Sequence, residues 1–186
     1  MEFVQPIRDR KKIESIKKVL KSLNNRDYLL FVMGINSGLR IGDLLRLNIS
    51  DVVDENRKIK DRISIREQKT GKSKNFPISN NVKKILNDYT QNMAMNDPLF
   101  PSRKGVKAIT RQQAYRILND VARTVGITDK IGTHTLRKTF AYHALKSGYD
   151  VIQLQKLFGH SAPSITMHYA GIEQDELDEI YLNLNL

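Results

Sequence analysis

Hydrophobic residues recur with helical spacing over most of this chain, and with strand-like alternation in one segment only. Ile13, Ile16 and Leu20 lie three or four positions apart with lysines between them, which is typical of an amphipathic helix. Between residues 58 and 78, apolar and polar residues alternate around a basic turn at 69–73, as they do in a hairpin. The chain is therefore expected to form a mainly α fold with a small antiparallel β-sheet.

One strongly apolar segment predicts a buried helix. Residues 28–35 read Tyr-Leu-Leu-Phe-Val-Met-Gly-Ile, which leaves no polar face for solvent, and Gly38 is placed to end the helix. Further helical periods cover 41–47, 82–93, 110–125, 133–146, 150–158, 163–169 and 174–184. With 186 residues, the chain is long enough to form one domain with a buried core.

Charge is distributed unevenly along the chain. Lys and Arg number 31 against 20 Asp and Glu, which gives a net charge of +11 at pH 7. Residues 173–186 hold five carboxylates and no Lys or Arg, so residues 1–172 carry +16. This charge favours a polyanionic partner such as nucleic acid or an anionic surface. We therefore divide the chain into a basic domain at 1–172 and an acidic, amphipathic C-terminal tail at 173–186.

Composition excludes several kinds of protein. The chain has no cysteine, which excludes thiol nucleophiles, disulfides and thiolate zinc sites and is compatible with a reducing cytoplasm. Its longest apolar stretch, 28–35, is far shorter than the roughly 20 residues that cross a bilayer, and its first residues lack an export signal. We expect a cytoplasmic protein with no membrane partner.

Two familiar motifs for cofactors and metals are incomplete in this sequence. Gly71-Lys72-Ser73 resembles the end of a phosphate-binding loop, but the glycine required five residues earlier is Arg66. The four histidines form no His-Glu-x-x-His pair. We therefore expect neither a cofactor nor a metal site.

The C-terminal half combines residues that suit phosphate chemistry. Thr133 is expected to cap a helix, which places His134 in its first turn and Arg137 on the same face. A helix N-terminus attracts anions, and arginine offers a planar fork to two phosphate oxygens. His160 follows a glycine, and Tyr169 lies nine residues further on. A tyrosine can act as a covalent nucleophile where its neighbours stabilise negative charge.

These residues resemble those of the tyrosine recombinases, also called the phage integrase family. Residues 38–47, Gly-Leu-Arg-Ile-Gly-Asp-Leu-Leu-Arg-Leu, are similar to the block around the family's first catalytic arginine, and 134–137 to its His-x-x-Arg pair. The resemblance covers most of the chain and implies the tyrosine recombinase/integrase catalytic-domain fold. It assigns catalytic roles to Arg40, Lys69, His134, Arg137, His160 and Tyr169.

The resemblance implies a site-specific recombinase that cleaves and rejoins DNA strands by phosphoryl transfer. Arg40 and Arg137 are expected to absorb the charge of the phosphodiester, so that no Mg²⁺ is required. Tyr169 is expected to form a 3′-phosphotyrosyl intermediate. Lys69 is the expected general acid for the leaving 5′-hydroxyl, and the nearby lysines of the same turn are alternatives.

Other residues are expected to support this chemistry. Asp43, three residues after Arg40, is expected to orient that arginine. A further set of basic side chains is expected to contact DNA phosphates: Lys72, Lys74, Arg103, Lys104 and Arg111.

Two other functions remain open for the same residues. A type IB topoisomerase-like enzyme uses similar chemistry to relax DNA, and a non-catalytic DNA-binding regulator keeps only the fold. The length of the chain and the short interval from His160 to Tyr169 favour the recombinase over the topoisomerase. The complete set of six residues argues against the regulator, because a binding protein needs no nucleophile.

The chain departs from the family in length. Family members usually carry an N-terminal core-binding domain of about a hundred residues. Only about forty residues precede Arg40 here, so that domain is expected to be absent, and the chain is either the catalytic part of a longer protein or a short stand-alone relative. The expected partners are double-stranded DNA, further copies of the chain in a tetrameric synapse, and accessory DNA-binding proteins. The tail at 173–186 is expected to contact a neighbouring protomer or its own chain.

Overall fold

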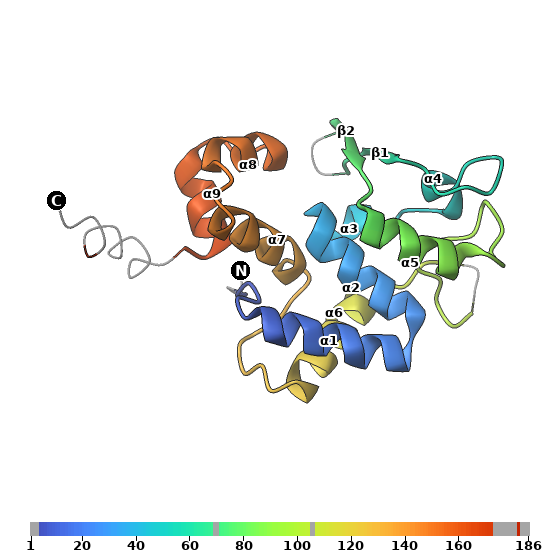
Figure 1. Ribbon diagram of the computed structural model, residues 1–186, viewed down its shortest axis with the longest axis horizontal. Helices are drawn as coiled ribbons and strands as arrows, with labels where there is room; N and C mark the ends of the chain where they lie inside the picture. Colours follow the sequence, from blue (N-terminus) through green and yellow to red (C-terminus); the bar gives the residue numbers. More distant parts are fainter. Residues whose placement is uncertain (1–3, 69–70, 105–106, 173–181, 183–186) are drawn as a thin grey trace.

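The computed structural model describes residues 4–68, 71–104, 107–172 and 182, which form a mainly helical fold with one small sheet (Figure 1). The elements in chain order are α1 (Arg10–Leu23), α2 (Asn25–Ser37), α3 (Ile41–Leu44), α4 (Ile49–Val52), β1 (Arg62–Arg66), β2 (Ser73–Pro77), α5 (Asn80–Thr90), α6 (Arg111–Thr124), α7 (Thr135–Lys146), α8 (Val151–Phe158) and α9 (Pro163–Ala170). The predicted fold class is confirmed, whereas the helix predicted at 174–184 lies almost entirely outside the described residues. No helix in the described ranges is both long enough and apolar enough to span a membrane.

The predicted hairpin is an antiparallel pair of short strands. In its register Ile63 lies opposite Phe76, and Ile65 lies opposite Lys74. Residues that face each other across a ladder project to the same side of the sheet, and Ile63 is fully buried. This side of the hairpin therefore faces the helices, and Lys74 shares it.

Helix α2 lies at the centre of the fold, and its predicted burial is confirmed. Leu29 and Val32 are 0% exposed. A side chain at Gly34 would collide with Leu136, so the glycine allows α2 and α7 to pack closely. Gly38 ends the helix as predicted, with a φ of 61° in the left-handed region that glycine adopts readily.

The buried apolar side chains of the described residues form two separate clusters. The larger extends from Ile7 to Leu136 and defines what we call the body. The smaller joins Ala141 of α7, Phe158 of α8 and Ala170 of α9. We call α8 and α9 with this small cluster the C-terminal lobe, and Figure 1 shows both helices in orange, apart from α1, α2 and α5. Helix α7 connects the two parts because it contributes a side chain to each cluster.

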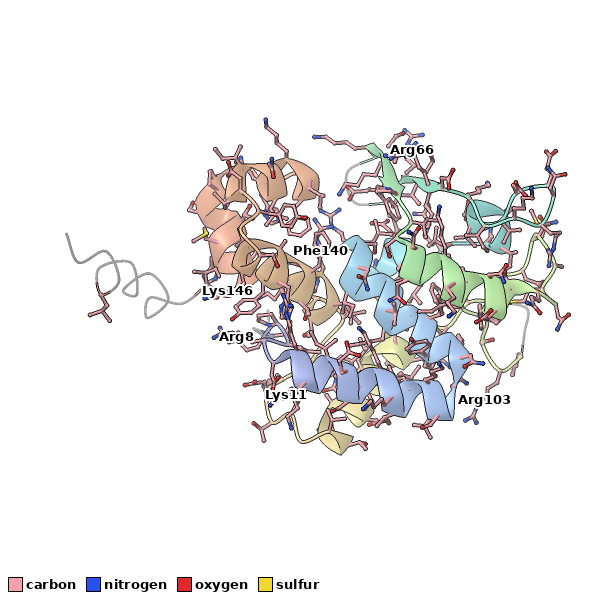
Figure 2. The ribbon with its side chains drawn as sticks, viewed as in Figure 1. Arg8, Lys11, Arg66, Arg103, Phe140 and Lys146 are labelled. Atoms are coloured by element: carbon pink, nitrogen blue, oxygen red, sulfur yellow. The ribbon has the colours of Figure 1, made fainter. Side chains whose placement is uncertain are left out.

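The segment before α1 ties the start of the chain to α7 and α9. The backbone N–H of Ile7 donates to Thr139 Oγ1 at 2.9 Å, and His143 Nε2 lies 3.0 Å from the Ile7 carbonyl oxygen. Arg8 donates from Nη2 to the carbonyl oxygen of Gly171, just after α9, at 2.8 Å. Figure 2 shows Arg8 where the chain enters α1. The N-terminal segment thus holds the end of the C-terminal lobe.

Candidate active site

Arg137 lies inside the protein where α2, α7 and α8 meet. It is 2% exposed. Its Nη1 donates to the carbonyl oxygen of Gly38 at 2.8 Å, and its Nη2 donates to that of Phe158 at 3.2 Å. These carbonyls end α2 and α8, where helix dipoles concentrate negative charge. The guanidinium also lies 4.1 Å from the centroid of the Phe158 ring, so its position is held on two sides.

Arg40 is the residue just before α3, and its side chain is 21% exposed. Its Nη1 donates to Glu67 Oε1 at 2.8 Å. The same oxygen accepts a bond from Lys74 Nζ at 2.8 Å. One carboxylate thus bridges a cation of the helical body and a cation of the hairpin.

Asp43 is the residue expected to orient Arg40, and the structure corrects this. Asp43 is buried, but its Oδ1 accepts a bond from the backbone N–H of Gln68 at 2.9 Å. Its side chain therefore holds the start of the hairpin turn, and Glu67 takes the place beside Arg40. Sequence reasoning missed Glu67, although it continues the inward alternation of 63 and 65, where a buried carboxylate requires a partner.

Lys74 links the hairpin to the C-terminal lobe. Besides its bond to Glu67, its Nζ donates to the carbonyl oxygen of Leu157 at 2.7 Å. Burial lowers the pKa of Lys74, the positive charges of Arg137 and Arg40 lower it further, and Glu67 raises it. Lys74 and Arg137 together place two positive charges on the negative C-terminal end of α8.

Tyr169 lies in the last turn of α9. Its hydroxyl is buried and makes no hydrogen bond of normal geometry with the described residues, although the Arg137 guanidinium comes close enough to lower the pKa of the phenol. Its ring centroid lies 5.3 Å from that of His160, and Lys138 Nζ lies 5.5 Å from the Tyr169 centroid. Burial raises the pKa of Tyr169, while the positive charges of Arg137 and Arg40 act against this increase. The phenol is therefore a neutral group held in a positive field.

His160 follows Gly159, which ends α8 with a φ of 69° in the left-handed region. Its Nδ1 lies 3.0 Å from Thr166 Oγ1, and Thr166 is fully buried. Burial lowers the pKa of His160, and the nearby Arg137, Arg40 and Lys74 lower it further. The imidazole is therefore neutral at pH 7, with one ring nitrogen oriented by the threonine.

His134 stands exposed at the N-terminal end of the helix that carries Arg137. We expect Thr133 to cap this helix, but His134 itself is the N-cap residue. The reason is a turn just before the helix, in which Thr135 Oγ1 accepts a bond from the backbone N–H of Gly132 at 3.0 Å. The helix consequently starts at Thr135, and His134 precedes its first turn.

The remaining basic residues predicted for catalysis or DNA contact are not among the side chains described above. Lys69 lies outside the described residues, and Lys72 is exposed on the hairpin turn. The guanidinium of Arg111 lies against Gly42 of α3. Arg103 and Lys104 are exposed, and Figure 2 shows Arg103 far from the hairpin. Contacts of all of these with DNA stay predictions.

The described residues contain no group of three His, Asp or Glu that could hold a metal ion. What the site assembles is positive charge around a phenol: the guanidinium groups of Arg40 and Arg137, the ammonium groups of Lys74 and Lys138, and the neutral imidazole of His160. Such donors suit an oxyanion with several oxygens, because arginine binds phosphate through parallel hydrogen bonds. The arrangement can hold a phosphate diester beside the oxygen of Tyr169.

Comparisons with known proteins agree with this chemistry. The profile of the phage integrase family matches residues 9–176. The probable integrase/recombinase YoeC of Bacillus subtilis is 45% identical over 181 residues, and the match covers 97% of each chain. The tyrosine recombinase XerC of Thermodesulfovibrio yellowstonii is 31% identical over 166 residues, which cover 84% of this chain and 53% of XerC. The chain thus spans nearly all of one relative and about half of another.

Solved structures of recombinases also resemble this chain. A crystal structure of XerA recombinase matches with a TM-score of 0.78 at 25% identity, and the match covers 100% of this chain and 67% of XerA. The profile match includes Arg40, His134, Arg137, His160 and Tyr169 in one continuous region. Sequence, fold and the assembled residues lead to one conclusion: the chain belongs to the phage integrase family, the tyrosine recombinases.

Proposed function

We propose that this chain is a site-specific recombinase that cleaves and rejoins DNA strands through Tyr169. The observation that carries the proposal is the buried Tyr169 hydroxyl, which makes no hydrogen bond of normal geometry in the described part of the chain and lies in the field of Arg40 and of Arg137, whose guanidinium comes close enough to lower the pKa of the phenol. A buried polar atom without a partner is costly in a folded protein. A phosphate diester bound to the two arginines would bring the partner that this oxygen lacks.

The two arginines differ in what they offer the phosphate. Arg137 is anchored by two backbone carbonyls, so it supplies a fixed positive charge. Arg40 is partly exposed and uses one nitrogen for Glu67, and its remaining N–H donors suit the non-bridging oxygens. His134 and His160 are proposed as further donors. Together they would stabilise the charge that grows on those oxygens in the transition state.

The proposed reaction exchanges one phosphoester for another. The Tyr169 oxygen gives up its proton to water and attacks phosphorus, the bond from phosphorus to the 5′ oxygen breaks, and a 3′-phosphotyrosyl bond forms. The leaving 5′ oxygen takes a proton from a lysine of the hairpin. Lys69 is the first candidate, and Lys74 lies within the site. Attack by a 5′-hydroxyl of another strand reverses these steps and joins the strands.

We also propose separate roles for two parts of the chain. Residues 1–172 are proposed as the catalytic domain, and the tail at 173–186 as a contact between protomers on double-stranded DNA. Among the structural relatives, XerH is seen bound to its palindromic difH substrate, which supports DNA as the partner here. We propose that the protein acts in the cytoplasm.

Covalent capture tests the proposed nucleophile. The protein is incubated in EDTA with a pool of nicked duplexes of randomised sequence, in which the short cleaved strand dissociates and prevents rejoining. A protein–DNA adduct on a denaturing gel is expected from the natural sequence, and Tyr169→Phe is expected to abolish it. Tyr149→Phe is the matched control, because Tyr149 is 63% exposed. An adduct that survives Tyr169→Phe would place the nucleophile elsewhere.

A further inference from the structure

Glu67 is a buried carboxylate that no expectation from the sequence assigned to the site. It is 3% exposed and directly follows β1, on the inward side that Ile63 also occupies. Its Oε1 lies 2.8 Å from both Arg40 Nη1 and Lys74 Nζ. A buried charge is retained only with close partners, and here the partners are two cations of the proposed phosphate site.

We propose that Glu67 is a positioning residue for strand cleavage, whose carboxylate holds the Arg40 guanidinium and the Lys74 ammonium in the orientation that receives the scissile phosphate. The inference rests on the proposed function and assigns a new role within the same site. Glu67 itself touches neither substrate nor nucleophile.

The need for such a residue follows from the charge around it. Arg40, Lys74 and Arg137 all act on His160, so three positive charges share one small space. Without DNA these charges repel one another, and flexible side chains such as Lys74 would turn toward solvent. A fixed negative charge beneath them keeps the site assembled before the phosphate arrives, which reduces reorganisation during the reaction.

The geometry leaves room for the phosphate as an additional ligand. The Glu67 side chain is 2% exposed, whereas those of Arg40 and Lys74 are 21% and 23% exposed. The carboxylate therefore lies behind the cations, away from the solvent side from which DNA must approach. The phosphate would bind in front of the same two cations, and Glu67 would stay in place.

The pKa of Lys74 distinguishes a positioning role of Glu67 from a merely structural one, because it depends on the charge of the Glu67 carboxylate. The groups that face this lysine are Glu67, Arg40, Arg137 and His160. Burial lowers the pKa of Lys74 and the two arginines lower it further, while only Glu67 raises it. Loss of the carboxylate charge therefore lowers this pKa, and Lys74 loses its proton at a lower pH.

The test measures single-turnover adduct formation across pH with a nicked duplex recovered from the randomised pool. Glu67→Gln is expected to slow the reaction about a hundredfold, as misplacement of reacting groups does, and to move the alkaline limb of the pH profile to lower pH. Glu67→Asp keeps the charge, so its alkaline limb is expected to stay near that of the natural protein. Affinity for the duplex is expected to change far less than the rate. Glu55→Gln, in an exposed turn, is the matched control.

The outcomes separate this inference from the proposed function. If the natural protein forms no adduct, the proposed function fails. If it forms one and Glu67→Gln reacts at the same rate with the same pH profile, the role of Glu67 is overturned and the function stands. If Glu67→Gln does not fold, Glu67→Asp carries the test: it keeps the charge but withdraws the carboxylate by one methylene, so the reaction is expected to slow while the alkaline limb stays in place. A Glu67→Asp protein that reacts at the natural rate then overturns the inference.

Discussion

The body and the C-terminal lobe of this protein are held together in different ways. The body has a continuous apolar core with large side chains such as Phe31 and Phe100. The C-terminal lobe carries Tyr169, and within the described part of the chain its buried core consists of Ala141, Phe158 and Ala170 with a few partly buried neighbours. The segment that presents the nucleophile is thus the less densely packed of the two.

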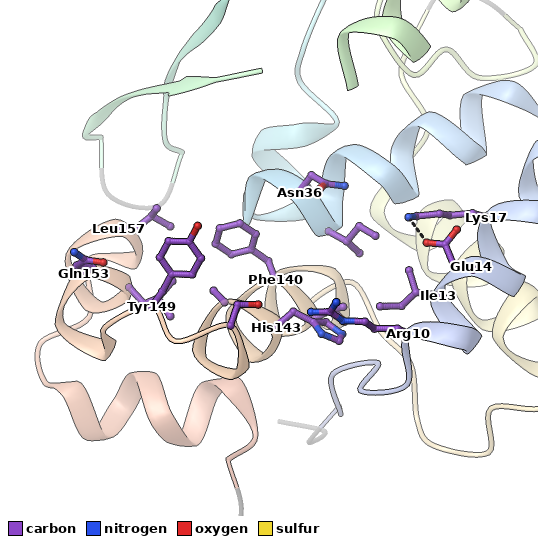
Figure 3. Close-up of a pocket in the computed structure, with 15 residues that line it drawn as sticks. Arg10, Ile13, Glu14, Lys17, Asn36, Phe140, His143, Tyr149, Gln153 and Leu157 are labelled. Carbon is purple, nitrogen blue, oxygen red and sulfur yellow. Dashed lines mark hydrogen bonds and ion pairs between the residues drawn. The ribbon is translucent and has the colours of Figure 1, made fainter. Parts of the chain in front are cut away.

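Polar bonds compensate for the small core of the lobe. Arg137 and Lys74 donate to carbonyls at the end of α8, and Arg8 donates to Gly171 after α9. A groove of about 650 Å³ lies between α1 and α2 of the body and the helices α7 and α8 (Figure 3). Segments with few buried apolar contacts open with a lower free energy than core helices. This difference suits a nucleophile that is buried in the free protein and must meet DNA.

The largest expected effects come from replacing one buried phenylalanine in the body and one in the C-terminal lobe, which tests whether the two regions differ in stability. Phe31 and Phe158 are each 1% exposed, but one lies in the body and the other in the lobe. Phe31→Ala is expected to lower the free energy of global unfolding by about 3–5 kcal/mol, measured by urea denaturation. Phe158→Ala is expected to act mainly on the lobe, with faster amide exchange in α8 and α9 and little change in α2 and α5.

This prediction has a definite counter-result. If Phe158→Ala accelerates amide exchange equally in α2, α5, α8 and α9, the two regions unfold as one cooperative unit. The lobe would then share the stability of the body, and its small core would not make it easier to open.

A smaller loss of stability is expected when the bond between the N-terminal segment and the C-terminal lobe is removed. Arg8→Ala removes the bond to the Gly171 carbonyl oxygen and the contact of the guanidinium with the Tyr142 ring, 5.6 Å from its centroid. We expect the opening free energy of α9 to fall by about 1 kcal/mol, measured by amide exchange. Lys11→Ala, in an exposed position of α1, is the control and should leave α9 unchanged. Equal effects of both changes would exclude a specific link from Arg8 to the lobe.

The smallest expected effect is a dependence on pH. Burial lowers the pKa of His160 and also that of His143, whose ring contacts the Ile7 carbonyl oxygen. The folded state then binds fewer protons than the unfolded state, so stability present above about pH 6.5 is lost as the pH falls toward the folded pKa values. Both histidines belong to the lobe or its attachment. Acidification from pH 7 to 5 should therefore increase amide exchange in α8 and α9 before it does so in α2.

The pKa of His160 can be measured directly, and its value tests whether nearby positive charges lower it. Titration by NMR is expected to place His160 below the ordinary histidine value of about 6.5. Arg40→Gln removes one of the positive charges that lower the pKa of His160, so it should raise that pKa. A pKa of His160 that is unaffected by Arg40→Gln would mean that the two side chains are not electrostatically coupled.

Local patterns in the sequence were sufficient to predict most of the fold. The helical spacing of Ile13, Ile16 and Leu20 and the alternation around Ile63 are properties of short segments, and secondary structure depends on such spacing. Gly38 and Gly159 mark helix ends because each adopts a left-handed backbone conformation. The family and its candidate residues were likewise readable, since motifs are defined by order and spacing along the chain.

Contacts between distant parts of the chain were decided by the tertiary structure. Lys74 is the hairpin lysine seen in the site because the register places it opposite Ile65 on the inward side, and the register depends on how the turn closes. Arg40 binds Glu67, 27 positions away, and not the nearby Asp43. These pairings depend on how helices and hairpin pack in three dimensions, and no periodicity within one segment specifies them. The sequence by itself therefore determined which groups the protein brings to phosphate chemistry, and only the folded structure decided which of them hold one another in place.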